Sequence, residues 1–276
     1  MHQTPSACIG LLPHLGILTV GGPDQLAFLQ GQATCDFRNR SETQAWPGAF
    51  CNAKGRGIAN FIALGWGETC RLVLSHELVD DLRVHLQRYV LRAKVTLEAA
   101  QDDCALLGIV PPVSLPGNLA LPSSELEVQR ENGRIFVRMR GNAPRGLILT
   151  TPADAAELIE TYVAAGCAHQ EQPDFWCRED ILAGWPWVCA ATRERFTPQM
   201  LGLDQLGAIS FEKGCYTGQE IVARTHYLGT AKRGIRSVQG TGLPPAPGEH
   251  WTGGIIVNTA PDNGGWVGLA VASDAE

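Results

Sequence analysis

The hydrophobic pattern of the first third of the chain predicts short strands broken by one or two helices. Residues 15–20 (LGILTV) form an apolar run that predicts a strand, and Gly-Pro-Asp at 22–24 predicts a short helix that ends at Gly31. The stretch 49–75 has apolar runs separated by turn residues, which is typical of an antiparallel meander. Leucines at helical spacing after Ser75 predict the second helix, with Ser75 as its cap.

Strands predominate again from residue 93 to residue 150, and helices and a β-rich end follow. The apolar runs predict strands at 94–99, 105–110, 125–130 and 134–140. Glu131-Asn132-Gly133 between the last two strands is a hairpin signature. Helices are predicted at 151–166 and 173–184, and the Gly- and Pro-rich sequence after 240 predicts a small all-β unit. Because strands and helices do not alternate in regular βαβ units, the expected fold class is α+β.

Length and composition restrict the class of protein. The 276 residues allow one large domain or two to three small ones, and 45% apolar with 18% charged residues excludes a disordered chain. No apolar run reaches the ~18–20 residues of a membrane helix. The first residues, MHQTPSACIG, lack the basic and apolar regions of an export signal. We therefore expect a cytoplasmic protein with no membrane partner.

Nine cysteines are the unusual feature of the composition. They are scattered, at positions 8, 35, 51, 70, 104, 167, 177, 189 and 215, and no two form a C-x-x-C pair. Zinc and iron–sulfur sites usually draw their ligands from close pairs. An odd number of cysteines without an export signal also disfavours a disulfide framework. We expect no metal site, and most of the cysteines should be small core residues in a reduced protein.

One segment, 211–236, concentrates basic residues in an acidic chain. It holds five basic and two acidic residues, a local charge of +3, whereas the whole chain carries −6. Thr217-Gly-Gln-Glu220 fits a capping box that would begin a short helix. Cys215 would then lie just ahead of a helix N-terminus, where the macrodipole favours an anion. With Lys213 and Gly214 beside it, this setting favours the thiolate. A functional thiol and an ordinary cysteine near a helix cap are equally open at this point.

The same segment resembles a known family. K-G-C-Y-T-G-Q-E (213–220) matches the signature of the YgfZ family of folate-binding iron–sulfur assembly proteins, which are related to the glycine-cleavage T-protein. The resemblance covers the chain up to about residue 236. The further matching positions are Phe28-Leu29-Gln30-Gly31, Thr34, Asp36, Lys54-Gly55-Arg56, Asp180-Ile181, Ala183-Gly184, Phe196, Pro198-Gln199, the run from Leu203 through Gly207, Ile209-Ser210-Phe211, Ile221-Val222-Ala223-Arg224, Gly229 and Lys232-Arg233.

The resemblance implies the T-protein fold, in which three subdomains form a ring around a central folate pocket and the last is a small β-barrel. The expected subdomains are 1–110, 111–228 with the motif, and 229–276, the first two of them interleaved. The Pro-rich stretch 111–124 would be a loop that separates subdomains. The chain after 236 is short for this family, so the last strand or two of the barrel would be missing or contributed differently.

The resemblance also implies a function and a set of site residues. Members of the family are needed for full activity of certain iron–sulfur enzymes, including one that methylthiolates tRNA. The expected cofactor is tetrahydrofolate or a one-carbon derivative, and the expected partners are iron–sulfur enzymes or their assembly factors. Cys215 would be the functional thiol and Lys213 the motif lysine, and a basic residue suits the anionic glutamate tail of folate. The other motif positions are Gly214, Tyr216, Thr217, Gly218, Gln219, Glu220 and Arg224. The expected folate contacts are Lys213, Phe211, Arg56 and Asp36. A contact with RNA would use Lys232, Arg233 and Arg236.

Two departures from the T-protein pattern weigh against an aminomethyltransferase. The aspartate pair of T-proteins is replaced by Ala59-Asn60, and Leu182 stands where they have a glutamate. Neither replacement can move protons at the folate nitrogens. Three functions stay open: a folate-binding accessory protein that works through Cys215, a tetrahydrofolate-dependent one-carbon transferase, and a non-catalytic module that docks a protein or RNA. Trp185 and Trp187 are expected in the core or in a pocket wall.

Overall fold

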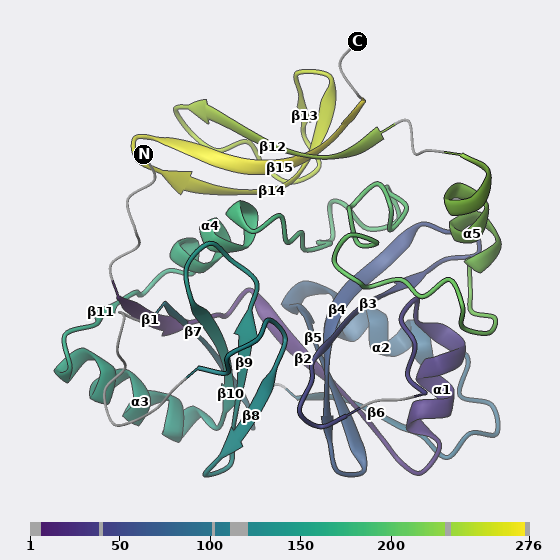
Figure 1. Ribbon diagram of the computed structural model, residues 1–276, viewed down its shortest axis with the longest axis horizontal. Helices are drawn as coiled ribbons and strands as arrows, with labels where there is room; N and C mark the ends of the chain where they lie inside the picture. The colour runs from purple at the N-terminus through teal and green to yellow at the C-terminus, as the bar shows by residue number, and fades with distance from the viewer. Residues whose placement is uncertain (1–6, 39–40, 101–102, 111–120, 230–232, 274–276) are drawn as a thin grey trace.

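Three β-sheets organise the protein. The structure, a computed structural model, describes residues 7–38, 41–100, 103–110, 121–229 and 233–273 of the chain. In Figure 1 two sheets lie next to each other, and the C-terminal sheet lies across one side of both. Strands and helices are mixed without regular βαβ repeats, which confirms the α+β class.

A five-stranded antiparallel sheet contains the predicted meander. Its strand order is β3-β4-β5-β2-β6. The bounds are β2 Leu15–Gly21, β3 Trp46–Cys51, β4 Gly57–Trp66, β5 Thr69–Ser75 and β6 Thr96–Ala100. The helices α1 (Gln25–Gln32) and α2 (Val79–Gln87) lie beside this sheet. The strand at 15–20 and the three strands within 49–75 are therefore confirmed.

A six-stranded sheet, ordered β11-β1-β7-β10-β9-β8, brings the first strand of the chain beside much later ones. The bounds are β1 Cys8–Leu11, β7 Ala105–Val110, β8 Val128–Glu131, β9 Arg134–Met139, β10 Arg145–Thr150 and β11 Ala168–His169. The β8–β9 hairpin is confirmed, because Asn132 (φ 51°) and Gly133 (φ 79°) both adopt the left-handed conformation of a type I′ turn. The wholly buried strand β10 was not predicted.

The helix α3 (Pro152–Ala164) covers the six-stranded sheet and begins where the sequence predicts. The Thr151 hydroxyl accepts a hydrogen bond from the Asp154 amide, and Gly166 follows the helix at φ 97°. The helix α4 (Asp174–Leu182) is confirmed as well, and it packs against the C-terminal sheet. Of the predicted loop 111–124, residues 111–120 lie outside the described part of the chain.

The C-terminal sheet confirms the small all-β unit. It has four strands in the order β12-β15-β14-β13 and curls into half a barrel. The bounds are β12 Arg233–Thr241, β13 His250–Trp251, β14 Gly254–Asp262 and β15 Gly265–Ser273. Val257 and Leu269 of this sheet join an apolar cluster that also holds Val20, Leu72 and Val188. Val188, which follows α4, is thus buried between the C-terminal sheet and the five-stranded sheet.

Two predicted helix starts are wrong in detail. The helix α1 begins at Gln25 rather than at Pro23, and Gly31 lies inside it. After Ser75 the chain makes a short 3-10 turn, η1 (His76–Leu78), before α2 begins, and the Ser75 side chain forms no cap.

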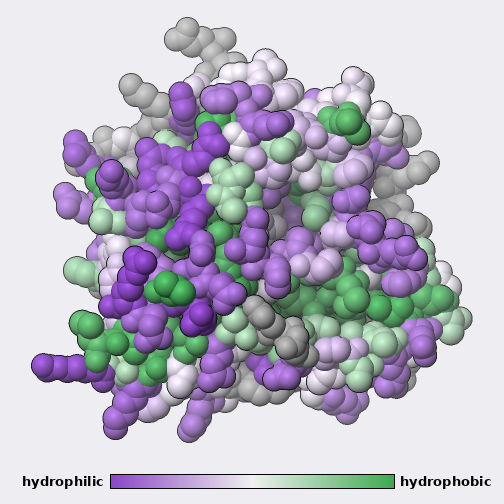
Figure 2. All heavy atoms as spheres, turned by 180° about the vertical axis from the view of Figure 1, so that it is seen from behind, coloured by the Kyte–Doolittle hydropathy of each residue, from purple (hydrophilic) through white to green (hydrophobic). Residues whose placement is uncertain are grey.

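No helix among the described residues is both long and apolar enough to cross a membrane. Figure 2 shows apolar atoms of the rear face gathered mainly in its lower half, among hydrophilic ones.

Candidate functional site

The motif 213–220 packs against the turn between β3 and β4 and leads into α5 (Gln219–Leu228). Gly218 is the N-cap of this helix at φ 83°, and a Cβ there would collide with the Asn52 carbonyl. Gly55 of the β3–β4 turn has φ 67°, and a Cβ there would lie 2.8 Å from the Cβ of Ile221 in α5. The predicted capping box is therefore wrong: Gly218, not Thr217, begins the helix, because packing against the turn requires the left-handed residue there.

Lys213 lies inside the protein. Its side chain is 4% exposed, and its Nζ donates hydrogen bonds to the carbonyls of Ala33 at 2.6 Å and Cys35 at 2.8 Å. The ammonium also lies 5.2 Å from the centre of the Tyr216 ring, at cation–π distance. Asp36 is near: the ion pair with Arg38 lowers the pKa of Asp36 well below its usual range, and Lys213 adds to that effect. Lys213 thus ties the motif to residues 33–36.

Cys215 is the only exposed cysteine of the nine. The others are buried or half-buried, and burial raises the pKa of the thiols of Cys51 and Cys177 to about 12. Gly214 beside Cys215 has no positive φ, and a Cβ built on it would meet nothing within 4 Å. Neither backbone strain nor packing within the described residues requires a glycine at 214, so the approach to the thiol is open.

The other predicted site residues are dispersed around the motif. Phe211 stacks on His226 of α5, with ring centres 3.6 Å apart. Arg56 is half-buried, and its Nη1 donates to the Arg195 carbonyl at 2.7 Å. Tyr216 is buried, and burial raises its pKa above the ordinary range. Thr217 and Gln219 are half-buried, whereas Glu220 and Arg224 are exposed.

The basic residues predicted to contact RNA lie at the start of β12. Arg233 and Arg236 are exposed and line a groove of about 340 Å³ together with His226, Gln205 and Asp204. Lys232 lies outside the described residues. Two arginines and a histidine in one groove can attract an anion, although Asp204 opposes them.

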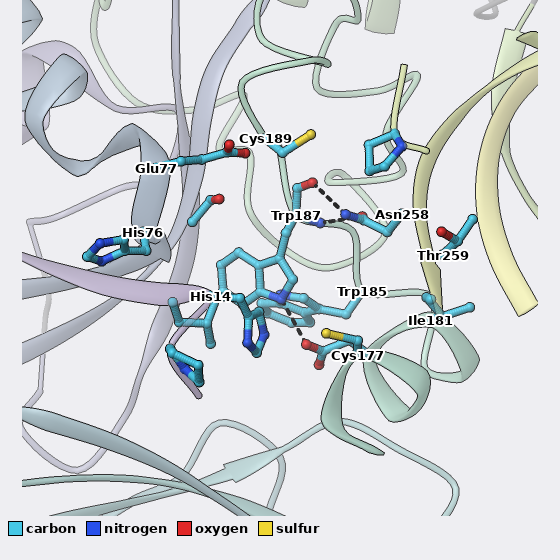
Figure 3. A pocket seen from close by; sticks show the side chains of 15 residues that line it. His14, His76, Glu77, Cys177, Ile181, Trp185, Trp187, Cys189, Asn258 and Thr259 are labelled. Carbon is cyan, nitrogen blue, oxygen red and sulfur yellow. Dashed lines mark hydrogen bonds between the residues drawn. The ribbon is translucent and has the colours of Figure 1, made fainter. Parts of the chain in front are cut away.

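A second site, which no sequence motif marks, is a cavity of about 410 Å³ between the sheets. We call it the tryptophan cavity, because the indoles of Trp185 and Trp187 form part of its wall (Figure 3). Four further lining residues come from separate parts of the chain: His14 before β2, Glu77 of η1, Asp180 of α4 and Asn258 of β14. No residue of the motif 213–220 lines this cavity. Both tryptophans are buried, as the sequence analysis expects.

Two asparagines hold the main chain around the tryptophans. Asn60 donates from Nδ2 to the Pro186 carbonyl (2.8 Å), and its Oδ1 accepts from the Val188 amide (2.7 Å). Asn258 forms the same pair of bonds with the main chain of Trp187. Its Oδ1 accepts from the Trp187 amide (2.8 Å), and its Nδ2 donates to the Trp187 carbonyl (3.0 Å). An aspartate at position 60 could accept but not donate. Asn60 therefore serves to hold the wall of the cavity.

Asp180 is bonded on both carboxylate oxygens. Its Oδ1 accepts from Arg145 Nη1 at 2.6 Å in an ion pair that is almost completely buried, and its Oδ2 accepts from Trp187 Nε1 at 2.8 Å. The Arg145 guanidinium also lies 4.6 Å from the centre of the Trp176 ring. This network fixes the Trp187 indole and occupies the Asp180 carboxylate.

Other buried polar groups of the cavity have no partner. Neither ring nitrogen of His14 nor the Nε1 of Trp185 forms a hydrogen bond with any described residue. Burial lowers the pKa of His14, although Asp180 and Asp174 act in the opposite direction. No sequence motif marks His14. No cluster of three or more His, Cys, Asp or Glu side chains that could hold a metal ion occurs in the described part of the chain.

The chain is similar to known proteins over most of its length. The tRNA-modifying protein YgfZ of Yersinia pestis (strain Pestoides F) is 33% identical over 258 residues, which cover 90% of this chain and 77% of that protein. The protein of the same name from Shigella boydii serotype 4 is 33% identical over 263 residues, covering 90% and 80%. No protein-family model matches.

A solved structure has the same fold. The glycine cleavage system aminomethyltransferase T from Bartonella henselae superposes with a TM-score of 0.74 at 16% identity, covering 99% of this chain and 80% of that one. At this identity the likeness extends to the fold alone.

Proposed function

The chain belongs to the YgfZ family of tRNA-modifying proteins, and on that premise we propose that it is a folate-binding accessory protein for iron–sulfur enzymes. Its role is to support the assembly or repair of such enzymes, including one that methylthiolates tRNA. The name of the relatives supports the link to tRNA modification. Cys215 is the working thiol, and the site of action is cytoplasmic.

The exposure of Cys215 carries this proposal. A thiol reacts with a partner as the thiolate and needs access to that partner. The eight other cysteines are buried or half-buried, whereas Cys215 is exposed, lies in the family octapeptide and has an open approach at Gly214. A single accessible thiol suits chemistry on a partner protein better than a resident cluster, which needs several ligands.

Folate fits the tryptophan cavity, and we assign tetrahydrofolate or a one-carbon derivative to it. Ligand pockets are typically about 300–1,000 Å³ and mostly apolar with a few polar groups, and this cavity has about 410 Å³, two indoles and unpartnered polar atoms. Its lining comes from the β1–β2 link, from α4 and the following segment, and from the C-terminal sheet. This supports the expected arrangement of three subdomains around one pocket. In this proposal Lys213 does not contact folate. Its ammonium group donates to the carbonyls of Ala33 and Cys35, so its role is structural.

A one-carbon transferase is the weaker alternative. Positions 60 and 182 carry no carboxylate, and both carboxylates that line the cavity are already bonded. Asp180 binds Arg145 and Trp187, and Glu77 accepts from the Ala190 amide at 2.7 Å. Uptake of a proton by Asp180 would weaken its bonds to Arg145 and Trp187, which disfavours this carboxylate as a base for folate.

The decisive experiment separates ligand binding from thiol chemistry. Tetrahydrofolate and its one-carbon forms are titrated into the wild type and into Cys215→Ala, and both proteins are tested for rescue of a bacterial strain that lacks its own homologue. We expect Cys215→Ala to fold and to bind folate as the wild type does, and to lose rescue. Cys104→Ala, at a half-buried cysteine, is the matched control and should rescue. Full rescue by Cys215→Ala overturns the thiol role, and the absence of folate binding by the wild type overturns the cofactor.

Exposed arginines favour one further role, docking of RNA. Reversal of Arg233 and Arg236 to glutamate should weaken binding of tRNA to the protein, and the wild-type affinity should fall steeply with salt because phosphate contacts release counterions. Arg140→Glu is a control at another exposed arginine, outside the groove. Equal tRNA binding by the wild type and the double variant contradicts this role.

A further inference from the structure

A cluster of three aromatic side chains reaches the groove at the start of β12. Phe211 and His226 stack, with ring centres 3.6 Å apart and ring planes 11° apart. Tyr227 is 66% exposed, and its ring centre lies 4.8 Å from that of His226 at a steep angle of 77°. We call these three residues the aromatic platform. His226 connects the platform to the groove, because it lines the groove together with Arg233 and Arg236.

The geometry of the platform leaves one face of the His226 ring uncovered by the other two rings. Phe211 covers the opposite face, because the two planes are nearly parallel at stacking distance. The ring centres of Phe211 and Tyr227 are 6.3 Å apart, so the lines from His226 to these two rings form nearly a right angle. Tyr227 therefore stands beside the His226 ring and not over its second face. Since His226 is exposed and lines the groove, a planar group in the groove can stack on that face.

The groove also carries polar groups that suit a nucleotide. Arg233 and Arg236 are exposed in it, and arginines bind phosphate groups. Asp204 and Gln205 are exposed there as well, and their side chains offer acceptors and one amide donor to the edge of a base. A carboxylate in a basic groove disfavours a site for phosphate alone, because it repels phosphate, whereas it can accept from the amino group of a base.

We propose that the uncovered face of His226 stacks on an unpaired base of RNA, with Tyr227 beside the base and Arg233 and Arg236 on the adjoining phosphates. Proteins recognise RNA sequence mostly through unpaired bases, which can stack on aromatic side chains, whereas the bases of a duplex are already stacked on one another. This inference rests on the proposed docking of RNA. It goes beyond that role in naming how the RNA is held and in predicting a preference for single strands over duplexes.

The test compares the variants His226→Leu and His226→Phe with the wild type. Fluorescence anisotropy measures the affinity for a short single-stranded RNA, and for the same RNA annealed to its complement, over a range of salt concentrations. His226→Leu should lose about tenfold in affinity for the single strand, the effect of one stacking contact, with no change in the salt dependence. Its affinity for the duplex should stay that of the wild type. His226→Phe keeps an aromatic ring and should bind the single strand almost as the wild type does.

Further variants separate stacking from charge and from folding. The double variant Arg233→Glu, Arg236→Glu should bind both forms of RNA more weakly and flatten the salt dependence, because phosphate contacts release counterions. Tyr227→Leu, at an exposed side chain, should also weaken binding of the single strand, and it replaces His226→Leu if thermal unfolding shows that variant to be unfolded. His169→Leu, at an exposed histidine of β11 outside the groove, is the matched control and should bind as the wild type does.

Three outcomes would overturn the inference. Wild-type affinity of folded His226→Leu and Tyr227→Leu for the single strand, with a loss in the double arginine variant, rules out the stacking and leaves the docking of RNA intact. Displacement of the RNA by adenosine monophosphate at the affinity of the RNA itself would assign the groove to a free nucleotide. A wild type that binds no RNA overturns the docking role and this inference together.

Discussion

Asn258 pairs with the main chain of Trp187 as a neighbouring β-strand would. Its amide accepts from the Trp187 N–H and donates to the Trp187 carbonyl. Asn258 belongs to the C-terminal sheet. Asn60, which bonds the main chain of Pro186 and Val188 on either side of Trp187, belongs to the first meander. The wall of the tryptophan cavity is thus fixed from two sheets at once, and changes in either sheet should reach the cavity.

Asn60→Asp should destabilise the protein and should not introduce transferase activity. The carboxylate could still accept from the Val188 amide, but it could not donate to the Pro186 carbonyl, and it would be buried. We expect a loss of about 1–3 kcal/mol in the free energy of unfolding, measured by urea denaturation. Asn142→Asp, at an exposed position, is the control. Unchanged stability together with folate-dependent turnover would revive the transferase hypothesis.

Lys213→Met should lower stability rather than only ligand affinity. The variant keeps a long side chain but removes the donor to the carbonyls of Ala33 and Cys35, which would then be left without it. The expected cost is about 1–3 kcal/mol in the free energy of unfolding. Lys54→Met, at an exposed lysine, should change stability little. Full stability with a selective loss of folate affinity would instead support the folate contact that the family resemblance implies.

The variants Gly214→Ala and Gly218→Ala should distinguish access to the Cys215 thiol from the stability of the fold. At position 218 the left-handed backbone and the Asn52 carbonyl both exclude a Cβ, so alanine should cost about 1–3 kcal/mol of stability. At position 214 the added methyl meets open space, so stability should change by less than about 0.5 kcal/mol. Complementation should nevertheless fall, because the methyl narrows the approach to Cys215. Normal complementation by a folded Gly214→Ala protein would mean that no partner approaches there.

The pH dependence of stability should report on His14. Burial lowers its pKa in the folded protein below the ordinary value of 6.5, with Asp180 and Asp174 opposing. The unfolded chain therefore binds a proton at His14 more readily than the folded one, so the contribution of His14 to stability falls as the pH drops below about 6.5. His14→Phe removes this proton uptake, so its stability should decrease less than that of the wild type between pH 7 and pH 5. Parallel pH profiles in urea denaturation would show that His14 is not buried in solution.

Local features of the fold were accessible from the sequence. The meander at 49–75, the Asn132-Gly133 hairpin and the start of α3 at Thr151 depend on the conformational preferences of neighbouring residues. The octapeptide around Cys215 was equally visible, and so was its family. The start of α5 was not, because the conformation of Gly218 is imposed by contact with Asn52, far away in the chain.

The sequence by itself therefore determined the fold class, most of the elements and the special position of Cys215 among the cysteines, because these follow from spacing and side-chain type. Only the tertiary structure decided that Lys213 is buried and that His14, Trp185 and Asn258 share one cavity. Those three residues are brought together by the packing of the sheets. No local pattern encodes a contact between residues that far apart, because it depends on the burial of the whole core.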